Sequence, residues 1–538
     1  MHKACRFLIA LLLSAVFSQV VAAAQKPCES LAGLALSGTK ITLAQSMPAG
    51  AFTPPPSPGP PTGPPTSYKD VPAFCRVIAE LTPTADSEIK IEVWMPTGGW
   101  NGRYRGQGNG GFAGMIDYPG LGAAVKQGYA TAGTDTGHSG SAVDAAWALG
   151  HPQKVIDFGY RAIHEMTLKT KAIVDAFYGH NAQHSYFASC SDGGREALME
   201  AQRFPEDYDG ILAGAPANYW THLLIGAMWD TQATTFDPAS YIPASKLSAL
   251  SAAVLAACDA RDGLSDDILN DPRQCHFDST TLLCQGADSA SCLTAPQVAA
   301  LQKIYEGPHD ASGHRVFPGY LPGGEEGPGG WGLWITGPAP GRGLISLFGV
   351  GYFSNMVYEK SDWDPKSFKL DEALKVAETK TAHALNAIDP NLKPFQARGG
   401  KLILYHGWND AAIPATNTID YYRSVVTKMG QRDTDSFVRL FLAPGMQHCA
   451  GGPGPSFFGQ FGDAPSHDPE HNAFAALEQW VEKDIAPSFV IATKYAGDNP
   501  AHGVRMTRLL CPYPQVAKYK GAGNANDAAS FACVPGTK

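Results

Sequence analysis

Charged side chains are sparse in this sequence, and basic ones are scarcer than acidic ones. Asp, Glu, Lys and Arg make up 17% of the 538 residues, and the formal net charge is −9. A protein that binds nucleic acid or an anionic membrane surface through charge needs clustered Lys and Arg. We therefore expect neither kind of partner. The apolar share of 44% is instead typical of a globular protein.

Long apolar runs are missing after the first two dozen residues. The run "FLIALLLSAVF" follows a short basic start, "MHKACR", and precedes the small residues Ala22, Ala23 and Ala24. This order is typical of a secretory signal peptide, and the run is short for a membrane anchor. We expect a signal peptide over residues 1–24, no later membrane span, and a soluble protein that is secreted or periplasmic.

An unpaired cysteine is also missing once that signal is removed. Cleavage removes Cys5 and leaves ten cysteines, an even number that favours five disulfides in an exported protein. Proximity along the chain favours the pairs Cys28–Cys75, Cys258–Cys275, Cys284–Cys292 and Cys511–Cys533. Cys190 and Cys449 remain, far apart in sequence, either as a fifth disulfide or as two buried thiols.

Short apolar runs separated by glycine turns indicate an α/β fold with a parallel sheet. Residues 87–96 alternate between apolar and polar, and residues 185–189 and 209–217 are further β-prone runs. Residues 195–203 have helical composition, and residues 105–114 read as a glycine-rich loop. Strand, sharp turn, helix and strand in this order are typical of parallel sheets.

The strand pattern stops after residue 219 and resumes at "KLILYHGWND" (401–410) and "FVRLFLAPGMQHC" (437–449). The stretch between holds an acidic loop and a tract rich in glycine and tryptophan. We therefore predict one α/β domain, with its first part at 25–219 and its second at 401–538, interrupted by an inserted domain at 220–400.

The segment "SCSDG" nearly matches the nucleophile-elbow pattern G-x-S-x-G, in which a sharp strand-to-helix turn exposes a serine. A turn of small residues with a capping serine would look similar. In α/β-hydrolases the acid and then the base follow the serine along the chain, each after a later strand. Asp410 and His448 occupy such positions, so we predict Ser191 as nucleophile, Asp410 as acid and His448 as base.

Other residues compete for these roles. Asp420 could be the acid, and His467 or His471 the base, but no predicted strand leads into them. His138 precedes the serine, which is the wrong order. Cys190 precedes Ser191 and Cys449 follows His448. A disulfide between these cysteines would set their Cα atoms roughly 5–6 Å apart and hold nucleophile and base within reach of each other.

These motifs, a Cys-Ser pair before Gly-Gly-Arg, "HGWND" and "GMQHC", resemble the tannase and feruloyl esterase family of secreted serine esterases. The resemblance extends from the Cys75 region to Cys533. The family also includes hydrolases of mono(2-hydroxyethyl) terephthalate. The resemblance implies an α/β-hydrolase core, a lid domain inserted between nucleophile and acid, and a disulfide that bridges the triad residues. The sequence departs from the family at Ser189, where the family usually has glycine.

Ester hydrolysis by a serine requires backbone N–H donors for the tetrahedral oxyanion. We expect one from Asp192, the residue after the nucleophile, and the other from Gly110 or Gly111 in the glycine-rich loop. That loop lacks the Lys-Ser/Thr ending and the G-x-G-x-x-G spacing of nucleotide-binding loops, so we expect no organic cofactor.

The acidic loop between Cys258 and Cys275 carries oxygen ligands of the kind that Ca²⁺ prefers, although its spacing is not that of an EF-hand. A solvated acidic loop has the same composition. The family carries a calcium site in this segment of the lid, and the resemblance implies a structural role. The implied ligands are Asp259, Asp262 and Asp266, with the carbonyls of Leu264 and Ile268.

Substrate choice is expected to depend on aromatic residues of the insertion, which suit an aromatic acyl group but also suit a core. The candidates are Trp331, Trp334, Phe348, Tyr352 and Phe353. The resemblance implies that the terephthalate monoester hydrolases of this family bind the free carboxylate with a lid arginine. The comparable stretch here, "LFGVGYFSNMVY", has no arginine, and the nearest one in sequence is Arg342. This favours small esters of uncharged hydroxycinnamoyl or galloyl groups. A terephthalate-type or general arylesterase and a non-catalytic calcium-dependent binding protein remain alternatives.

Overall fold

The computed structural model describes residues 25–56, 66–461 and 466–536. The expected signal peptide lies outside these residues. A nine-stranded sheet with the order β1-β2-β3-β5-β4-β6-β7-β8-β9 forms the centre of the molecule. Its strands are β1 (Thr39–Met47), β2 (Phe74–Leu81), β3 (Ile89–Pro96), β4 (Arg103–Gln107), β5 (Ala130–Thr134), β6 (His184–Cys190), β7 (Gly210–Gly214), β8 (Lys401–Gly407) and β9 (Val438–Ala443).

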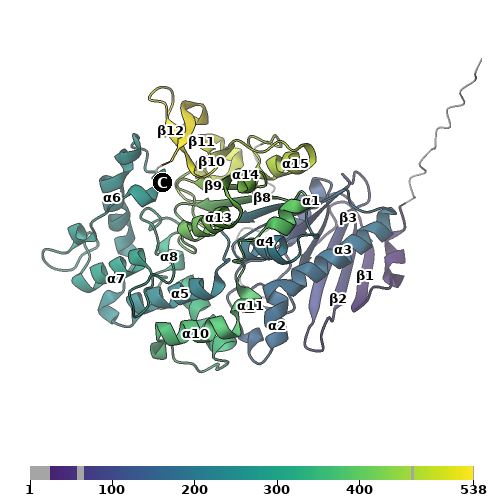
Figure 1. The fold of residues 1–538 in the computed structure, drawn as a ribbon, viewed down its shortest axis with the longest axis horizontal. Coiled ribbons are helices and arrows are strands. Elements are labelled where there is room, and N and C mark those ends of the chain that lie inside the picture. Colours follow the sequence, from purple (N-terminus) through teal and green to yellow (C-terminus); the bar gives the residue numbers. More distant parts are fainter. Residues whose placement is uncertain (1–24, 57–65, 462–465, 537–538) are drawn as a thin grey trace, which may run out of the picture.

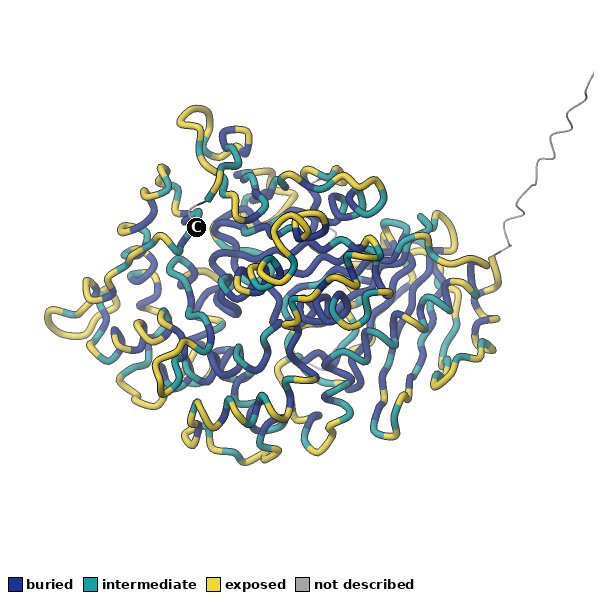
Figure 2. Tube along the Cα trace, in the orientation of Figure 1, coloured by how far each residue is buried: buried dark blue, intermediate teal, exposed yellow. Residues whose placement is uncertain are grey.

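In sheet order the strands from β5 to β9 are parallel. The pairs β1–β2, β2–β3 and β3–β5 are antiparallel. The parallel sheet that the sequence indicates therefore has an antiparallel edge. Hairpin-connected strands with one face open to solvent can pair antiparallel without a crossover helix. Strands β7 and β8 are buried along nearly their whole length, as expected for strands covered on both faces, and lie in the buried centre in Figure 2.

Helices cover both faces of the sheet. They are α1 (Tyr118–Lys126), α2 (Pro152–Ile156), α3 (Ala162–Tyr178), α4 (Asp192–Arg203), α12 (Lys393–Ala397), α13 (Ala415–Met429), α14 (Gln431–Asp435) and α15 (Ala473–Lys483). Two small antiparallel pairs follow, β10 (Val490–Tyr495) with β11 (Val504–Leu510), and β12 (Gln515–Tyr519) with β13 (Phe531–Pro535).

A helical lid is inserted between β7 and β8 and gathers at one end of the molecule, opposite β1 and β2 (Figure 1). Its helices are α5 (Trp220–Thr235), α6 (Leu247–Cys258), α7 (Ala295–Glu306), α8 (Trp331–Trp334), α9 (Leu344–Tyr352), α10 (Leu370–Lys380) and α11 (Ala382–Leu385). The lid has its own apolar core, to which residues such as Leu224, Val254 and Leu301 contribute. The chain thus has an α/β-hydrolase core with a large inserted lid.

Two details differ from the sequence interpretation. Residues 105–107 belong to β4, so the glycine-rich loop begins at Gly108. One helical run among the described residues, Pro238–Asp262, is long and apolar enough by length and composition to cross a membrane, which the sequence analysis did not anticipate. Leu250 and Val254 of this run are buried in the lid core, and Cys258 is bonded to Cys275. The run is thus part of the lid, with 39% of its apolar window buried there.

Candidate active site

Ser191 stands on a sharp turn between β6, which ends at Cys190, and α4, which begins at Asp192. Its backbone has φ 68° and ψ −123°, a strained region for a residue with a side chain. The turn is held by two hydrogen bonds, from the Ser191 N–H to the Gly214 carbonyl (2.9 Å) and from the Ala217 N–H to the Ser191 carbonyl (3.0 Å). This geometry exposes the hydroxyl at the end of the strand, as in a nucleophile elbow.

Ser189 fits this turn because glycines surround it. A Cβ added at Gly193 would lie 1.9 Å from the Ser189 Oγ, and one at Gly108 would lie 2.8 Å from it. The hydroxymethyl group of Ser189 therefore occupies space that neighbouring side chains would otherwise fill. The departure from the usual first glycine is accommodated without loss of the turn.

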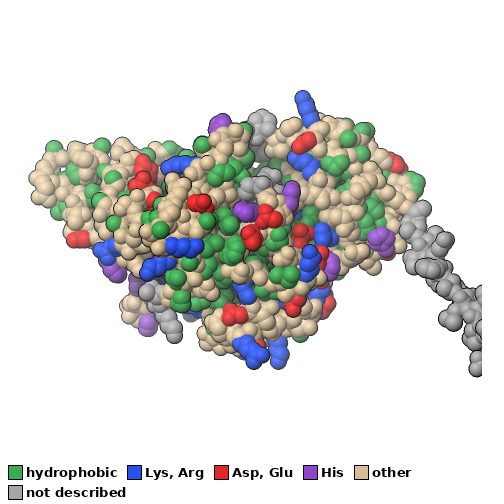
Figure 3. Space-filling model, turned by 90° about the horizontal axis from the view of Figure 1, so that it is seen from above, with side chains coloured by type: hydrophobic (Ala, Val, Ile, Leu, Met, Phe, Trp, Pro, Cys, Tyr) green, Lys and Arg blue, Asp and Glu red, His purple; other side chains and the backbone are tan. Residues whose placement is uncertain are grey.

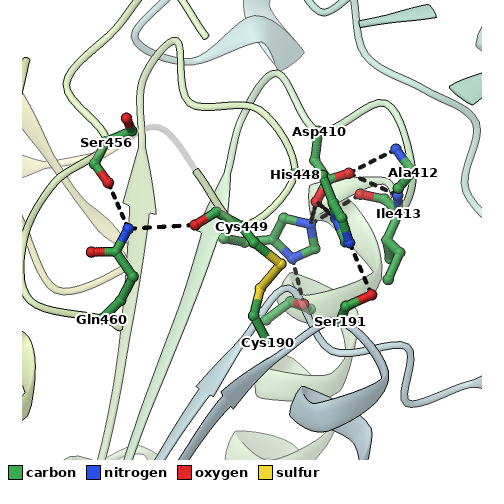
Figure 4. The surroundings of a disulfide bond; sticks show 11 residues. Cys190, Ser191, Asp410, Ala412, Ile413, His448, Cys449, Ser456 and Gln460 are labelled. Atoms are coloured by element: carbon green, nitrogen blue, oxygen red, sulfur yellow. Dashed lines mark hydrogen bonds and ion pairs between the residues drawn. A yellow bond between two sulfur atoms is a disulfide. The ribbon is translucent and has the colours of Figure 1, made fainter. Parts of the chain in front are cut away.

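His448 and Asp410 lie in line behind Ser191 (Figure 4). The His448 Nε2 is 2.9 Å from the Ser191 Oγ, and the His448 Nδ1 is 2.8 Å from an Asp410 carboxylate oxygen. Because the carboxylate can only accept, Nδ1 carries a proton and Nε2 is free to accept the serine proton. The three residues predicted from sequence are therefore brought together with hydrogen-bond geometry.

Asp410 is buried and held from several sides. One carboxylate oxygen accepts the N–H groups of Ala412 (2.8 Å) and Ile413 (2.9 Å), and the other also lies 3.1 Å from the His406 Nε2. Burial acts to raise the pKa of Asp410, but His448 and His406 outweigh it and hold this pKa below its usual range. Asp410 is therefore ionised when His448 becomes protonated, and its carboxylate can stabilise the imidazolium.

The competing residues are placed elsewhere. Asp420 is exposed and 3.9 Å from Arg315, His467 is exposed, and His471 pairs with Asp468. His138 is buried with its Nε2 on the Phe112 carbonyl, and burial lowers its pKa to about 4. None of these interactions involves Ser191.

All five expected disulfides are present, joining Cys28 to Cys75, Cys190 to Cys449, Cys258 to Cys275, Cys284 to Cys292, and Cys511 to Cys533. The Cys190–Cys449 bond joins positions 259 residues apart, with Cα atoms 6.0 Å from each other. It ties the residue before Ser191 directly to the residue after His448 (Figure 4).

The glycine-rich loop approaches Ser191 from the end of β4. Gly111 lines the same cavity as Ser191 and Asp192, whereas Gly110 does not. Gly111 has φ +59°, and a Cβ there would lie 2.3 Å from the Ala142 carbonyl oxygen, so the position requires glycine. Of the two candidate glycines, Gly111 is therefore the one that lies at the cavity together with Ser191 and Asp192.

Asn109 holds this loop and was missed in the sequence analysis. Its N–H donates to a Glu196 carboxylate oxygen (2.9 Å), its carbonyl accepts the Gly193 N–H (2.8 Å), and its side-chain amide donates to the Met115 and Thr134 carbonyls. Of the two polar residues within "GQGNGG", Gln107 ends β4 and Asn109 stands between glycines, and that placement was the available signal. Its contacts join the glycine-rich loop to the first turns of α4.

An apolar cavity opens beside the Ser191 hydroxyl. Of the five aromatic candidates, Trp334 and Phe348 line it. The further lining residues, which were not predicted, are Ala217, Trp220, Leu223, Leu224, Ala227, Tyr320, Ile345, Ala412 and Ile413. The apolar stripe of α5 at positions 220, 223, 224 and 227 was the sequence signal for this wall.

Trp331, Tyr352 and Phe353 do not line the cavity, and their expected role in substrate binding is not supported by their positions. Trp331 packs against Tyr305 in the lid core, and the Tyr352 hydroxyl is hydrogen-bonded to Thr381. Phe353 packs against aromatic neighbours of its own segment. These rings serve the core, which sequence composition alone does not distinguish from a pocket wall.

The acidic loop gathers oxygen atoms in a partly buried place. Asp262 accepts the N–H groups of Leu264 and Asn270 (both 3.1 Å), and Asp266 is paired with Arg508. Burial raises the pKa of Asp262, and the nearby carboxylates of Asp266 and Asp259 raise it further. The Asn270 Oδ1 is buried and has no hydrogen-bond partner. Oxygen donors of this kind suit Ca²⁺. Among the described residues, clusters with all ligand atoms within 4.8 Å of one another occur elsewhere, at Cys284, Asp288 and Cys292 and at His164, Glu200 and Asp207, so the three carboxylates of this loop are more widely spaced.

The sheet order, the turn that carries Ser191 and the insertion after β7 define an α/β-hydrolase with a lid. The chain belongs to the tannase and feruloyl esterase family, because residues 75–534 match the family model for tannase and feruloyl esterase. It is a carboxylic ester hydrolase.

Similar proteins agree with this assignment. An uncharacterized esterase of Xanthomonas campestris is 44% identical over 95% of this chain and 92% of its own length. A probable feruloyl esterase B of Aspergillus clavatus is 32% identical over 86% of each chain. The crystal structure of feruloyl esterase B from Aspergillus oryzae superposes with a TM-score of 0.84 and 30% identity, covering 94% of this chain and 99% of that one. Tannin acyl hydrolase from Aspergillus niger shares the fold, with a TM-score of 0.72 and 23% identity over 93% of this chain and 92% of its own.

Proposed function

We propose that this esterase hydrolyses esters of aromatic carboxylic acids through Ser191 and an acyl-enzyme intermediate. The observation that carries the proposal is the continuous hydrogen-bond line from the Ser191 Oγ through His448 to the buried Asp410 carboxylate, with distances of 2.9 and 2.8 Å. A binding protein of the same fold would have no use for all three groups in this order.

In the proposed reaction the His448 Nε2 accepts the Ser191 proton as the Oγ attacks the ester carbonyl carbon. Asp410 holds the imidazole and stabilises its cation. The N–H groups of Asp192 and Gly111 donate to the oxyanion, each worth roughly 10²–10³-fold in rate. The tetrahedral intermediate collapses as His448 donates the proton to the departing alkoxide, and a water molecule then repeats the sequence to release the acid.

The cavity favours an uncharged aromatic acyl group. Its wall combines the rings of Trp334, Phe348 and Trp220 with aliphatic side chains, and Asp192 directs its carboxylate to Arg195 (2.6 Å). Arg342 is exposed and is not part of the wall. An anionic acyl group such as terephthalate monoester would be desolvated there without a cation to pair with. Hydroxycinnamoyl and galloyl esters fit better, in line with the feruloyl esterases among the relatives.

To test this, purified protein is incubated with methyl ferulate, methyl gallate and mono(2-hydroxyethyl) terephthalate in one mixture. Each released acid is followed by chromatography. We expect ferulate or gallate to be released faster than terephthalate, since only terephthalate retains a charge in the cavity. Faster release of terephthalate would contradict the proposed acyl class. Release of none of the three acids would contradict aromatic ester hydrolysis itself.

We further propose that Ca²⁺ binds the acidic loop of the lid in a structural role. The residues that would hold it are the carboxylates of Asp259, Asp262 and Asp266 with the carbonyls of Leu264 and Ile268. The Asn270 Oδ1 is buried without a hydrogen-bond partner, and the Asn270 N–H donates to Asp262. Bound Ca²⁺ would offset the repulsion between the clustered carboxylates, and no step of the reaction involves it.

Adding Ca²⁺ to protein stripped with EGTA is expected to raise the melting temperature by roughly 3–5 °C, because a saturating ligand stabilises only the folded state. Differential scanning fluorimetry measures the shift. Asp262→Asn should abolish it, whereas Asp362→Asn, at an exposed lid position, should retain it. An equal rise in melting temperature in both variants would show that Ca²⁺ does not bind at Asp262.

We also propose that the protein acts outside the cytoplasm, either secreted or in a periplasm. Five disulfides among the described residues support this, because structural disulfides persist in oxidising compartments. The surface charges bear on possible partners. On the face shown in Figure 3, Lys and Arg side chains are scattered among acidic ones. That the protein binds neither nucleic acid nor membranes remains a prediction.

A further inference from the structure

The glycine-rich tract of the lid, residues 323–330, lies against both loops that carry the predicted acid and base. We call this segment the lid loop. Its own fold is held by Glu325, which is fully buried, accepts the Gly323 N–H (2.9 Å) and accepts the Tyr305 hydroxyl (2.6 Å). The lid loop leads directly into α8, which begins at Trp331.

Gln447, the residue before His448, uses both ends of its amide on the lid loop. Its Nε2 donates to the Glu326 carbonyl (2.7 Å), and its Oε1 accepts the Gly329 N–H (3.1 Å). The side chain is 1% exposed. Two hydrogen bonds to backbone groups three residues apart fix both position and orientation, and water does not compete for them.

Asn409, the residue before Asp410, contacts the same segment. Its side-chain amide donates to the Gly323 carbonyl. A Cβ at Gly324 would lie 2.7 Å from the Asn409 carbonyl oxygen, and a Cβ at Gly329 would lie 2.7 Å from the Gln447 Oε1. Close approach of these two residues therefore explains the glycines at 324 and 329.

The lid loop in turn positions Trp334. The Trp334 N–H donates to the Gly330 carbonyl (3.1 Å), and the Trp334 ring lies edge-to-face with the His448 ring, with centroids 4.9 Å apart. Trp334 also lines the acyl cavity. The chain of contacts runs from Gln447 through the lid loop to an aromatic wall that touches the neighbouring histidine.

We propose that Gln447 is a positioning residue for substrate selection, which holds the Trp334 wall of the acyl cavity in register with the loop of His448. The base loop has independent anchors, since Cys449 is bonded to Cys190 and the Asn409 N–H donates to the Met446 carbonyl (2.9 Å). Loss of the Gln447 amide should therefore free the Trp334 side of the acyl cavity to move, while His448 stays close to its position. The inference rests on the proposed function, because it concerns the acyl cavity of that same site.

The test compares Gln447→Met, which keeps the side-chain length but removes both hydrogen bonds, with Gln232→Met as control. Gln232 is a half-buried lid glutamine that donates only to the Phe368 carbonyl (3.1 Å). Kinetics are measured on methyl ferulate and on p-nitrophenyl acetate, whose acyl group is too small to need the wall. We expect Gln447→Met to lower the ratio of kcat/KM for ferulate over acetate about tenfold, mainly through KM. Gln232→Met should leave the ratio unchanged.

A double-mutant cycle with Trp334→Ala separates this role from general destabilisation. If Gln447 acts through Trp334, adding Gln447→Met to Trp334→Ala should change the ratio by less than about twofold. An unchanged ratio in Gln447→Met, a full additive effect in the double variant, or a loss matched by both glutamine variants would overturn the inference. Wild-type protein that cleaves acetate but no aromatic ester would instead overturn the proposed function.

Discussion

Replacing Ser191 by alanine should lower kcat for every ester that the protein hydrolyses by roughly five to six orders of magnitude. The loss is this large because the triad acts as a unit, and without the nucleophile only cavity and oxyanion contacts remain. The hydroxyl makes a hydrogen bond to His448 and lies at the cavity, so its removal should leave the melting temperature near that of the wild type.

Ser189→Ala is the matched control, since it removes a second serine hydroxyl from the same turn, two residues earlier. Its Oγ faces the space beside Gly193 and Gly108 rather than His448, so kcat should stay within about tenfold of wild type. A fluorophosphonate probe followed by mass spectrometry should label Ser191 in the wild type and in Ser189→Ala. Turnover by Ser191→Ala above about 1% of wild type would show that the nucleophile lies elsewhere.

The residues of the candidate site that were predictable are those placed by local rules. Ser191 follows a short strand and precedes a helix, and Asp410 and His448 each follow an apolar strand. Parallel strands bring such positions to one edge of the sheet. The pairing of Cys190 with Cys449 followed from the same placement. These predictions depended on pattern and order along the chain, not on packing.

The cavity could not be predicted because it depends on how the lid packs. Five aromatic residues from Trp331 to Phe353 looked equivalent in sequence, but only Trp334 of α8 and Phe348 of α9 line the cavity beside Ser191. The opposite wall comes from α5, about a hundred residues earlier. Side-chain composition is the same in a core and in a pocket, and only tertiary packing separates the two.

The antiparallel edge of the sheet and the glycines of the lid loop also depend on neighbours that the sequence pattern does not identify. Residues 89–96 alternate in a way that indicates a strand, but alternation does not reveal which neighbour it pairs with. The glycines at 324 and 329 indicate a loop, yet the reason for them lies in Asn409 and Gln447, more than 80 residues away. A glycine needed for close approach is visible only once its neighbour is known.

Replacing both Cys190 and Cys449 by alanine should lower stability and activity together. In the chain-entropy model, releasing a loop that spans 259 residues removes roughly 5–6 kcal/mol of stabilisation, an upper value for a native disulfide. The bond also joins the residue before Ser191 to the residue after His448. Even at a temperature where the variant remains folded, we expect kcat to fall about 100-fold, since a displacement of about 1 Å between reacting groups has that effect.

The control is the lid disulfide Cys284–Cys292, which closes a separation of only 8 residues and lies outside the site. Its double alanine variant should lose roughly 2–3 kcal/mol by the same model and keep its kcat. Circular dichroism would give the melting temperatures, and initial rates on methyl ferulate would be compared well below both. If the two double variants lose kcat equally, the effect is one of stability alone. If Cys190→Ala with Cys449→Ala keeps full kcat while folded, then the remaining contacts of the base loop are enough to place His448, and the disulfide serves the fold rather than the reaction.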